Sequence, residues 1–148
     1  MFKIILFEPE IPPNTGNIMR LSANTGFDLH LVKPLGFSVD DKSLKRAGMD
    51  YIRRTHFKVW ESLDECLKNI PVSTIYSVTT KGKTRYTDIN FKKGDAFIFG
   101  PESRGLSIEI REKYKSIYMP MQSEGRSLNL ANAVAVITYE VWRQLGFN

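Results

Sequence analysis

Cysteine and histidine are scarce in this chain of 148 residues, which has one cysteine, Cys66, and two histidines, His30 and His56. A disulfide framework and a zinc site built on cysteines both need several such residues, so the sequence excludes both within one chain. Nothing in the sequence brings the two histidines together, and we expect both to be structural. We therefore predict no metal site.

Long apolar runs are also missing. No stretch approaches the roughly 18 residues that a membrane-spanning helix needs, and the apolar start at residues 2–7 is too short for a signal peptide. We interpret that start as a buried strand and expect a cytoplasmic protein with no membrane partner. With 42% hydrophobic and 25% charged residues the composition is that of a folded domain, and the length predicts a single domain over residues 1–148.

Common nucleotide and nucleophile motifs are absent. The ten glycines contain no G-x-G pair, which excludes the dinucleotide fingerprint. Gly100 and Gly105 have the spacing that opens a P-loop, but Leu106 stands where that motif needs a lysine. There is also no G-x-S-x-G sequence for a nucleophile elbow.

Cationic residues outnumber acidic ones, 21 to 16, which gives a net charge of +5. Eleven of the 21 lie in residues 42–58 and 81–93, interleaved with aromatic side chains. Basic side chains neutralise phosphates and aromatic rings stack on bases, so these segments are typical of proteins that bind RNA or another polyanion. An ordinary solvated surface is the alternative.

Strand-like apolar runs alternate with helical patterns, which predicts an α/β domain with a mostly parallel sheet and helices on both faces. Strands are expected at residues 2–7, 27–33, 56–60, 75–78, 96–99 and 116–119, and helices at about 17–25, 41–47, 62–69 and 129–145. Ligands of such sheets bind outside the carboxyl ends of the strands. Four polar loops begin at those ends and should form one site: residues 8–16, 79–82, 100–105 and 120–129.

The last predicted helix has two apolar stripes at helical spacing. One stripe is formed by Leu130, Ala133, Val134, Ile137, Val141 and Leu145, and the other by Ala131, Ala135, Thr138 and Trp142. Because a helix that is apolar on two sides is buried on two sides, we expect one side to face a second subunit. A central core helix within a monomer is the alternative.

Three segments are rich in polar residues and lead into helices: residues 12–20, 99–106 and 126–133. Free N–H groups at helix starts favour anionic or polar ligands. Capping accounts for residues such as Asn14, Ser107 and Asn129. It does not account for three arginines in the same segments, Arg20, Arg104 and Arg126.

The whole chain, residues 1–148, resembles the YibK-like (TrmL) tRNA 2'-O-methyltransferases of the SPOUT superfamily. The resemblance is carried by residues 8–17, 99–106, 126–132 and 139–146, with shorter matches at 47–51 and 79–82. Two departures are visible, since Ala131 and Gly125 stand where relatives often have serine. Neither departure removes a suspected catalytic group.

This resemblance implies a single SPOUT methyltransferase domain, α/β in class, with a C-terminal trefoil knot. It also implies a homodimer with its site at the subunit interface. The implied reaction is methyl transfer from S-adenosylmethionine to the ribose 2'-oxygen of nucleotide 34, a C or a modified U, in certain leucine tRNAs.

The resemblance also implies which residues form the site. The cofactor is expected against Val78, Gly100, Met119, Ser127 and Leu128. The residues suggested for chemistry are Asn14, Arg20, Glu102, Ser127 and Asn129.

The proton of the ribose hydroxyl poses the chemical difficulty, because the matching segments contain no histidine. Arg20 is a poor base, since a guanidinium has a pKa above about 12. Either Arg20 is partly deprotonated in a special site, or it holds a phosphate or stabilises the developing alkoxide while another group takes the proton. We favour the second role. Three roles remain open for Glu102: it takes part in the chemistry, binds Arg104, or caps backbone N–H groups. Asn129 is expected to orient the loop or the substrate.

Two other functions compete with this reading. One is a non-catalytic RNA-binding module of the same fold, against which intact Arg20, Glu102, Ser127 and Asn129 argue. The other is a SPOUT 2'-O-methyltransferase that acts on another RNA, such as ribosomal RNA. For the tRNA reading, residues 42–58 and 81–93 are expected to contact the RNA, since we see no appended RNA-binding domain.

Overall fold

The computed structural model describes residues 1–40, 42, 44, 46, 55–122 and 126–148. In this part of the chain, parallel strands form one seven-stranded sheet in the order β3-β2-β1-β6-β4-β7-β5. The strands are β1 (Lys3–Phe7), β2 (Asp28–Val32), β3 (Phe57–Trp60), β4 (Ile75–Val78), β5 (Thr84–Arg85), β6 (Ala96–Phe99) and β7 (Lys115–Tyr118). The parallel α/β sheet predicted from the sequence is confirmed.

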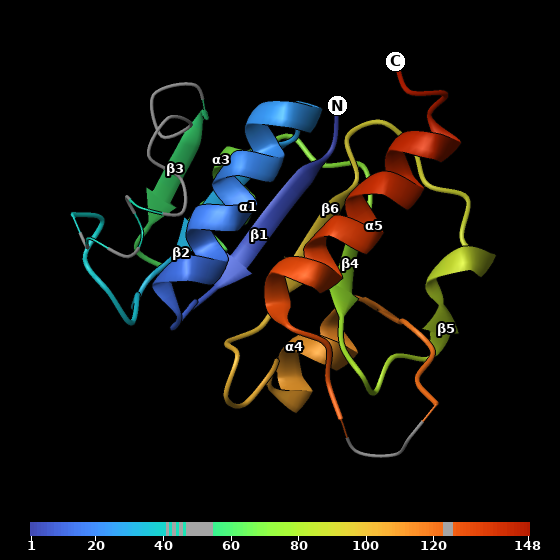
Figure 1. Cartoon of the computed structure of the whole chain (residues 1–148). Helices are drawn as coiled ribbons and strands as arrows, with labels where there is room; N and C mark the ends of the chain where they lie inside the picture. Colours follow the sequence, from blue (N-terminus) through green and yellow to red (C-terminus); the bar gives the residue numbers. More distant parts are fainter. Residues whose placement is uncertain (41, 43, 45, 47–54, 123–125) are drawn as a thin grey trace.

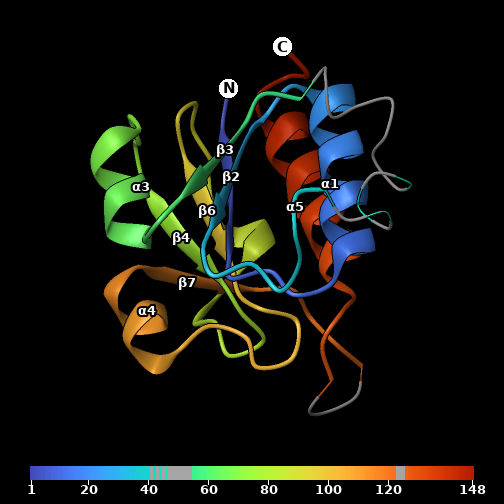
Figure 2. The same ribbon diagram turned by 90° about the vertical axis from the view of Figure 1, so that its left-hand side faces the viewer.

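Helices cover both faces of this sheet. Helices α1 (Pro12–Thr25) and α5 (Leu130–Gln144) lie side by side on one face, and α3 (Leu63–Asn69) and α4 (Ile108–Lys113) lie on the other (Figures 1 and 2). A short 3-10 helix, η1, spans Tyr86–Asp88. Successive residues of β6 point to opposite cores: Phe97 packs with the α1 and α5 side, and Ile98 with the α3 side. Burial on both faces explains why β6 is apolar throughout.

The structure corrects the predicted start of the first helix. We expected a loop at residues 11–16 and a helix from about residue 17, but α1 begins at Pro12, with Ile11 as its N-cap. Two prolines in the first turn cost the helix nothing, because the N–H groups they lack would have had no partner inside the helix. Asn14 is therefore a buried residue of the helix and not its cap.

Most other elements lie within a residue or two of their predicted bounds. Ser62 and Asn129 cap α3 and α5 with their side chains. A helix after residues 99–106 with Ser107 as its cap was predicted, and α4 confirms it. The sequence analysis did not predict the short elements β5 and η1. Of the helix predicted over 41–47, residues 42, 44 and 46 are described and are helical, and its other residues lie outside the described part of the chain. Most of the basic segment 42–58 also lies outside it.

His30 has the structural role expected of it. Its Nδ1 accepts a hydrogen bond of 3.1 Å from the indole of Trp60 on the neighbouring strand. Burial lowers the pKa of His30 to about 4, so the imidazole is neutral at physiological pH. His56 is exposed.

The order of strands forces one crossing of the backbone. Strand β7 is inserted between β4 and β5, so the connection at residues 79–83 has to cross β7. Thr79 N–H donates to the carbonyl of Ile117 at 3.0 Å. A Cβ on Gly82 would lie 2.3 Å from the carbonyl carbon of Ile117, so the crossing leaves no room for a side chain.

We predict that Gly82→Ala destabilises the chain by about 3 kcal/mol, because backbone has to move apart at the crossing. Urea unfolding followed by circular dichroism measures the effect. Gly105→Ala is the matched control, since a Cβ there meets nothing within 4 Å but the φ of +66° is unfavourable for alanine. That control should lose only about 1 kcal/mol. Equal losses in the two variants would contradict the steric account.

Candidate active site

A cavity of about 530 Å³ opens at the carboxyl ends of β1, β4, β6 and β7. All four loops predicted to converge contribute to it. The lining comprises Ile11 and Asn14, Val78 to Thr80, Phe99 to Leu106, Met119 and Met121, and Arg126 to Leu130 with Ala133. The predicted convergence of the four loops at this edge of the sheet is confirmed.

The structure brings most of the predicted site residues to this cavity. The lining includes the whole expected cofactor set, Val78, Gly100, Met119, Ser127 and Leu128. It also includes Asn14, Glu102 and Asn129. Arg20 does not line it. It lies on α1 six residues after Asn14, about 9 Å further along the helix, and it is exposed.

The carboxylate of Glu102 joins the loop after β6 to the start of α1. Its Oε1 accepts from the N–H of Glu10 at 2.9 Å, and its Oε2 accepts from the N–H of Ile11 at 2.8 Å. Oε2 also accepts from Nδ2 of Asn14 at 3.3 Å. Of the three roles open to Glu102 in the sequence, the structure shows the capping of backbone N–H groups.

Asn14 and Asn129 extend this contact across the cavity. Since a carboxylate only accepts, Asn14 has to donate its Nδ2 to Glu102, which leaves its Oδ1 as an acceptor. Nδ2 of Asn129 donates to that Oδ1 at 3.0 Å. The remaining oxygen of Asn129 accepts from the N–H of Asn132 and caps α5. One directional chain of hydrogen bonds therefore links three of the predicted residues.

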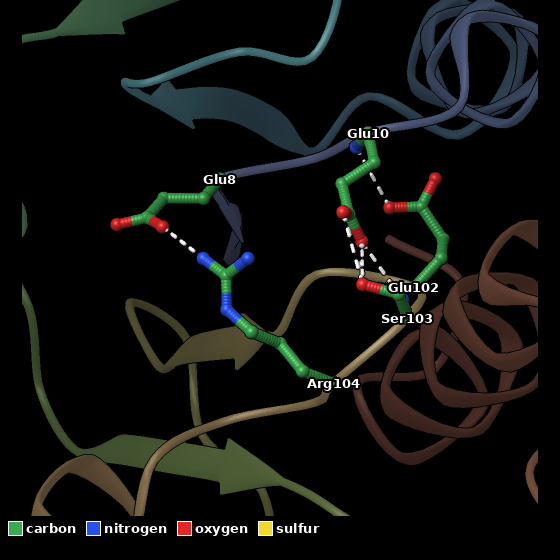
Figure 3. A network of polar contacts seen from close by, with 5 residues as sticks. All are labelled: Glu8, Glu10, Glu102, Ser103 and Arg104. Carbon is green, nitrogen blue, oxygen red and sulfur yellow. Dashed lines mark hydrogen bonds and ion pairs between the residues drawn. The ribbon is translucent and has the colours of Figure 1, made fainter.

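Two further contacts join the same pair of segments (Figure 3). Glu10 accepts from the N–H and the hydroxyl of Ser103 at 2.8 and 2.7 Å, and Arg104 forms an ion pair with Glu8. Two hydrogen bonds from Ser103 hold the pKa of Glu10 below its ordinary value; the bond from the N–H has the larger effect and the bond from the hydroxyl the smaller. The sequence analysis missed these partners, although two acidic residues in one segment and an arginine in the other were a usable signal.

Glu8 has an unusual backbone conformation for its residue type. Its φ of 52° lies in the left-handed region, which costs a non-glycine residue about 1–2 kcal/mol. Its carboxylate is the partner of Arg104, and its N–H donates to the carbonyl of Val32 at 2.9 Å. These contacts hold the turn that leads from β1 into the site.

The cavity offers positioning groups and no ready base. Among the described lining residues there is no histidine or cysteine, and the one carboxylate, that of Glu102, already accepts three hydrogen bonds. No group of three metal-binding side chains occurs among the described residues. No helix described here is long and apolar enough to cross a membrane.

Comparison with known proteins gives one consistent result. Residues 1–139 match the SpoU rRNA methylase family. The tRNA (cytidine(34)-2'-O)-methyltransferase of Methylovorus glucosotrophus is 52% identical over 150 aligned positions, which cover 99% of this chain and 97% of that protein. The enzyme of the same name from Escherichia coli K12 is 46% identical, covering 99% and 96% of the two chains.

Solved structures agree with the sequence relatives. A structure described as concerning 2-OH methylation of C/U34 on tRNA superimposes with a TM-score of 0.95, at 39% identity, covering 100% of this chain and 98% of that one. The SpoU methyltransferase AviRb from Streptomyces viridochromogenes, solved in complex with AdoMet, has the same fold. Its TM-score is 0.87 at 22% identity, covering 99% of this chain and 61% of that one.

Proposed function

This chain belongs to the SpoU rRNA methylase family, and on that premise we propose that it methylates the ribose 2'-oxygen of nucleotide 34 in tRNA. The methyl donor is S-adenosylmethionine, and the tRNAs are certain leucine tRNAs. One observation carries the proposal: the bonded chain from Glu102 through Asn14 to Asn129 lies in the cavity that the expected cofactor residues line. The near full-length similarity to enzymes of that name supports the substrate.

The cavity fits the cofactor in size and in chemistry. Its volume of about 530 Å³ lies within the range of small-molecule sites. Val78, Met119 and Leu128 offer apolar surface to an adenine ring or a thioether. At Gly100 a Cβ would lie 2.5 Å from the backbone of Gly105 and Leu106, so the loop folds back closely on itself beside the site.

The residues of the chain supply position and charge. When bound, S-adenosylmethionine supplies a methyl group that its sulfonium has already activated. The protein has to hold the ribose hydroxyl in line with that methyl, and positioning of this kind contributes several kcal/mol. Arg20 holds a phosphate of the substrate or stabilises the developing alkoxide, because its permanent positive charge attracts either negative group. Asn14 and Ser127 contact the substrate, and Asn129 orients Asn14.

The C-terminal part of the chain is proposed to form a trefoil knot. Two observations support it: β7 lies between β4 and β5, and residues 79–83 cross it at Gly82. The chain that leaves β7 lines the cavity at Met119, Met121 and Arg126 before α5 begins. A knot results if residues 79–83 loop around β7 and the chain that follows β7 passes through that loop.

We further propose that the chain forms a homodimer. Its proposed location is the cytoplasm, together with its tRNA substrate. Helices α1 and α5 share one face of the sheet (Figure 2), and on it Val136 and Tyr139 are 40% and 49% exposed. Nε1 of Trp142 is buried without a hydrogen-bond partner among the described residues. Arg20 lies on α1 outside the cavity of its own chain. A second copy over this face would place Arg20 at the subunit interface.

Arg20→Ala is expected to lower methyl transfer to tRNA by about 100-fold to 1,000-fold, the usual effect of removing one charge-stabilising donor. Cofactor affinity should be unchanged, since Arg20 does not line the cavity. The measurement is transfer of labelled methyl to unmethylated tRNA, with the modified nucleotide mapped by mass spectrometry, beside titration calorimetry with S-adenosylhomocysteine.

Lys68→Ala on α3 is the control, because it removes an exposed cation from the other face of the sheet. It should retain full activity. Label at a nucleotide other than 34 would overturn the proposed substrate. Full activity of Arg20→Ala would overturn the proposed role of that residue.

The dimer gives a separate prediction. Tyr139→Glu places a charge on the α1 and α5 face and should convert a species of twice the chain mass into the monomer in sedimentation velocity. Ile108→Glu is the matched control, since Ile108 is a 61% exposed apolar side chain on α4, on the opposite face. A wild-type chain that sediments as a monomer would refute the dimer.

A further inference from the structure

The basic segment 81–93 is divided between two ends of the sheet. Lys81, Lys83 and Arg85 follow the carboxyl end of β4 and run beside β7, next to the cavity. Lys92 and Lys93 precede β6 at the amino end of the strands, where Ser73 donates its hydroxyl to the carbonyl of Lys93. One continuous stretch of sequence therefore offers two separate clusters of cations, and only one lies near the site. We call residues 81–85 the basic arm.

The backbone of the basic arm is fixed in place. Val78, Thr79 and Thr80 line the cavity, and the arm begins at the next residue. Gly82 lies against the backbone of Ile117, and the N–H of Lys83 donates to the carbonyl and the hydroxyl of Ser116 at 3.2 and 3.0 Å. Arg85 pairs in register with Tyr118, one residue before Met119 of the cavity wall. The backbone of the basic arm is therefore held against β7 at the edge of the sheet, where β5 lies (Figure 1).

The side chains of the basic arm face solvent. From Lys81 to Tyr86, exposed and half-buried residues alternate, and the three cations occupy the exposed positions. Neither Lys81 nor Lys83 has an ion-pair partner among the described residues. Arg85 pairs with Asp88 at 3.1 Å, but both side chains are about half exposed, and such a pair contributes little. A stronger anion can therefore displace it.

The cations of the cavity lining differ from those of the arm in their pairing. Arg104 and Arg126 line the cavity, but Arg104 already forms an ion pair with Glu8. Lys81 and Lys83, next to the cavity, have no such partner among the described residues, so their charge remains available to an anion.

From this placement we infer that the basic arm binds backbone phosphates of the tRNA strand beside the methylated nucleotide. The inference rests on the proposed function for the identity of the RNA. Lys81 and Lys83 each contact a phosphate. Arg85 releases Asp88 and binds a third phosphate. These contacts carry no base specificity; they set the register of the strand so that one ribose reaches the cavity. Lys92 and Lys93 are too far from the site to contribute.

A different role for these lysines is protection of the sheet edge, because β5 is an edge strand and lysines on edge strands prevent aggregation. The two roles differ in what they predict. Protection of the edge leaves RNA affinity independent of Lys81 and Lys83, whereas phosphate binding makes affinity depend on both and on salt.

The test compares two double variants that remove the same charge, Lys81→Gln/Lys83→Gln and Lys92→Gln/Lys93→Gln. Binding of an unmethylated tRNA is measured by fluorescence anisotropy over a range of salt concentrations. The arm variant should bind about tenfold more weakly at about 0.1 M salt, and its slope of log affinity against log salt should be shallower by about 1.4, the value for two single-strand phosphates. The Lys92/Lys93 variant should match the wild type.

Two further measurements separate this inference from the proposed function. Titration with S-adenosylhomocysteine should give the same affinity for the arm variant as for the wild type, which shows that the cavity is intact. An unchanged tRNA affinity and salt slope in the arm variant, or an equal loss in the Lys92/Lys93 variant, would overturn the inference even if the wild type methylates nucleotide 34. Loss of tRNA affinity in the arm variant alone supports it, even if methyl transfer is later found on another nucleotide.

Discussion

One carboxylate holds the two main walls of the site together. Glu102 accepts from two backbone N–H groups and one side chain at the start of α1, across some 90 positions of sequence. Hydrogen bonds to a charged acceptor contribute more than neutral ones, about 1.5–3 kcal/mol each. The carboxylate also fixes the direction in which the amide of Asn14 points, and through it the amide of Asn129. A residue that sequence reasoning ranks among catalytic candidates therefore acts first by building the site.

The topology of the sheet determines where that site can be. Parallel strands bring their carboxyl ends to one edge, and the insertion of β7 between β4 and β5 brings the chain after β7 to the same edge. Gly82 permits the backbone crossing that this insertion requires, and Gly100 permits the close turn of the loop that carries Glu102. Each glycine removes a side chain where two stretches of backbone meet. The same crossing holds the basic arm beside the cavity, so the segment proposed to contact the RNA and the wall of the cavity belong to one piece of backbone.

Much of this was predictable from the sequence, for identifiable physical reasons. Strands such as Ala96–Phe99 are apolar throughout because both their faces are buried, and a parallel sheet then predicts which loops meet. The start of α1 was not predictable in the same way. Asn14, Thr15 and Gly16 read as a loop, and the contact that secures the start of their helix comes from Glu102, far along the chain. Short elements such as β5 give no periodic signal, since two residues cannot show a period.

Roles that depend on three-dimensional neighbours were the hardest to assign. The sequence left Glu102 with three possible roles, and only the positions of Glu10 and Ile11 decide between them. Arg20 belongs by motif to the same segment as Asn14, yet the helix carries it away from the cavity. The basic segment 81–93 looked like one surface, and the fold separates its two halves. Spacing along the sequence predicts which residues lie close together in space only where the secondary structure between them is known.

The bridge made by Glu102 is the contact on which the site depends, and hydrogen exchange together with cofactor titration on Glu102→Ala tests it. In the wild type, the amides of Glu10 and Ile11 should be protected from exchange by their bonds to the carboxylate. In the variant both amides should lose protection, and affinity for S-adenosylhomocysteine should fall about tenfold or more, as loss of about 1.4 kcal/mol implies. Glu102→Gln keeps one accepting oxygen, so its amide protection and its affinity for S-adenosylhomocysteine should lie between those of the wild type and of Glu102→Ala. Unchanged protection of both amides together with unchanged affinity in Glu102→Ala would contradict the account.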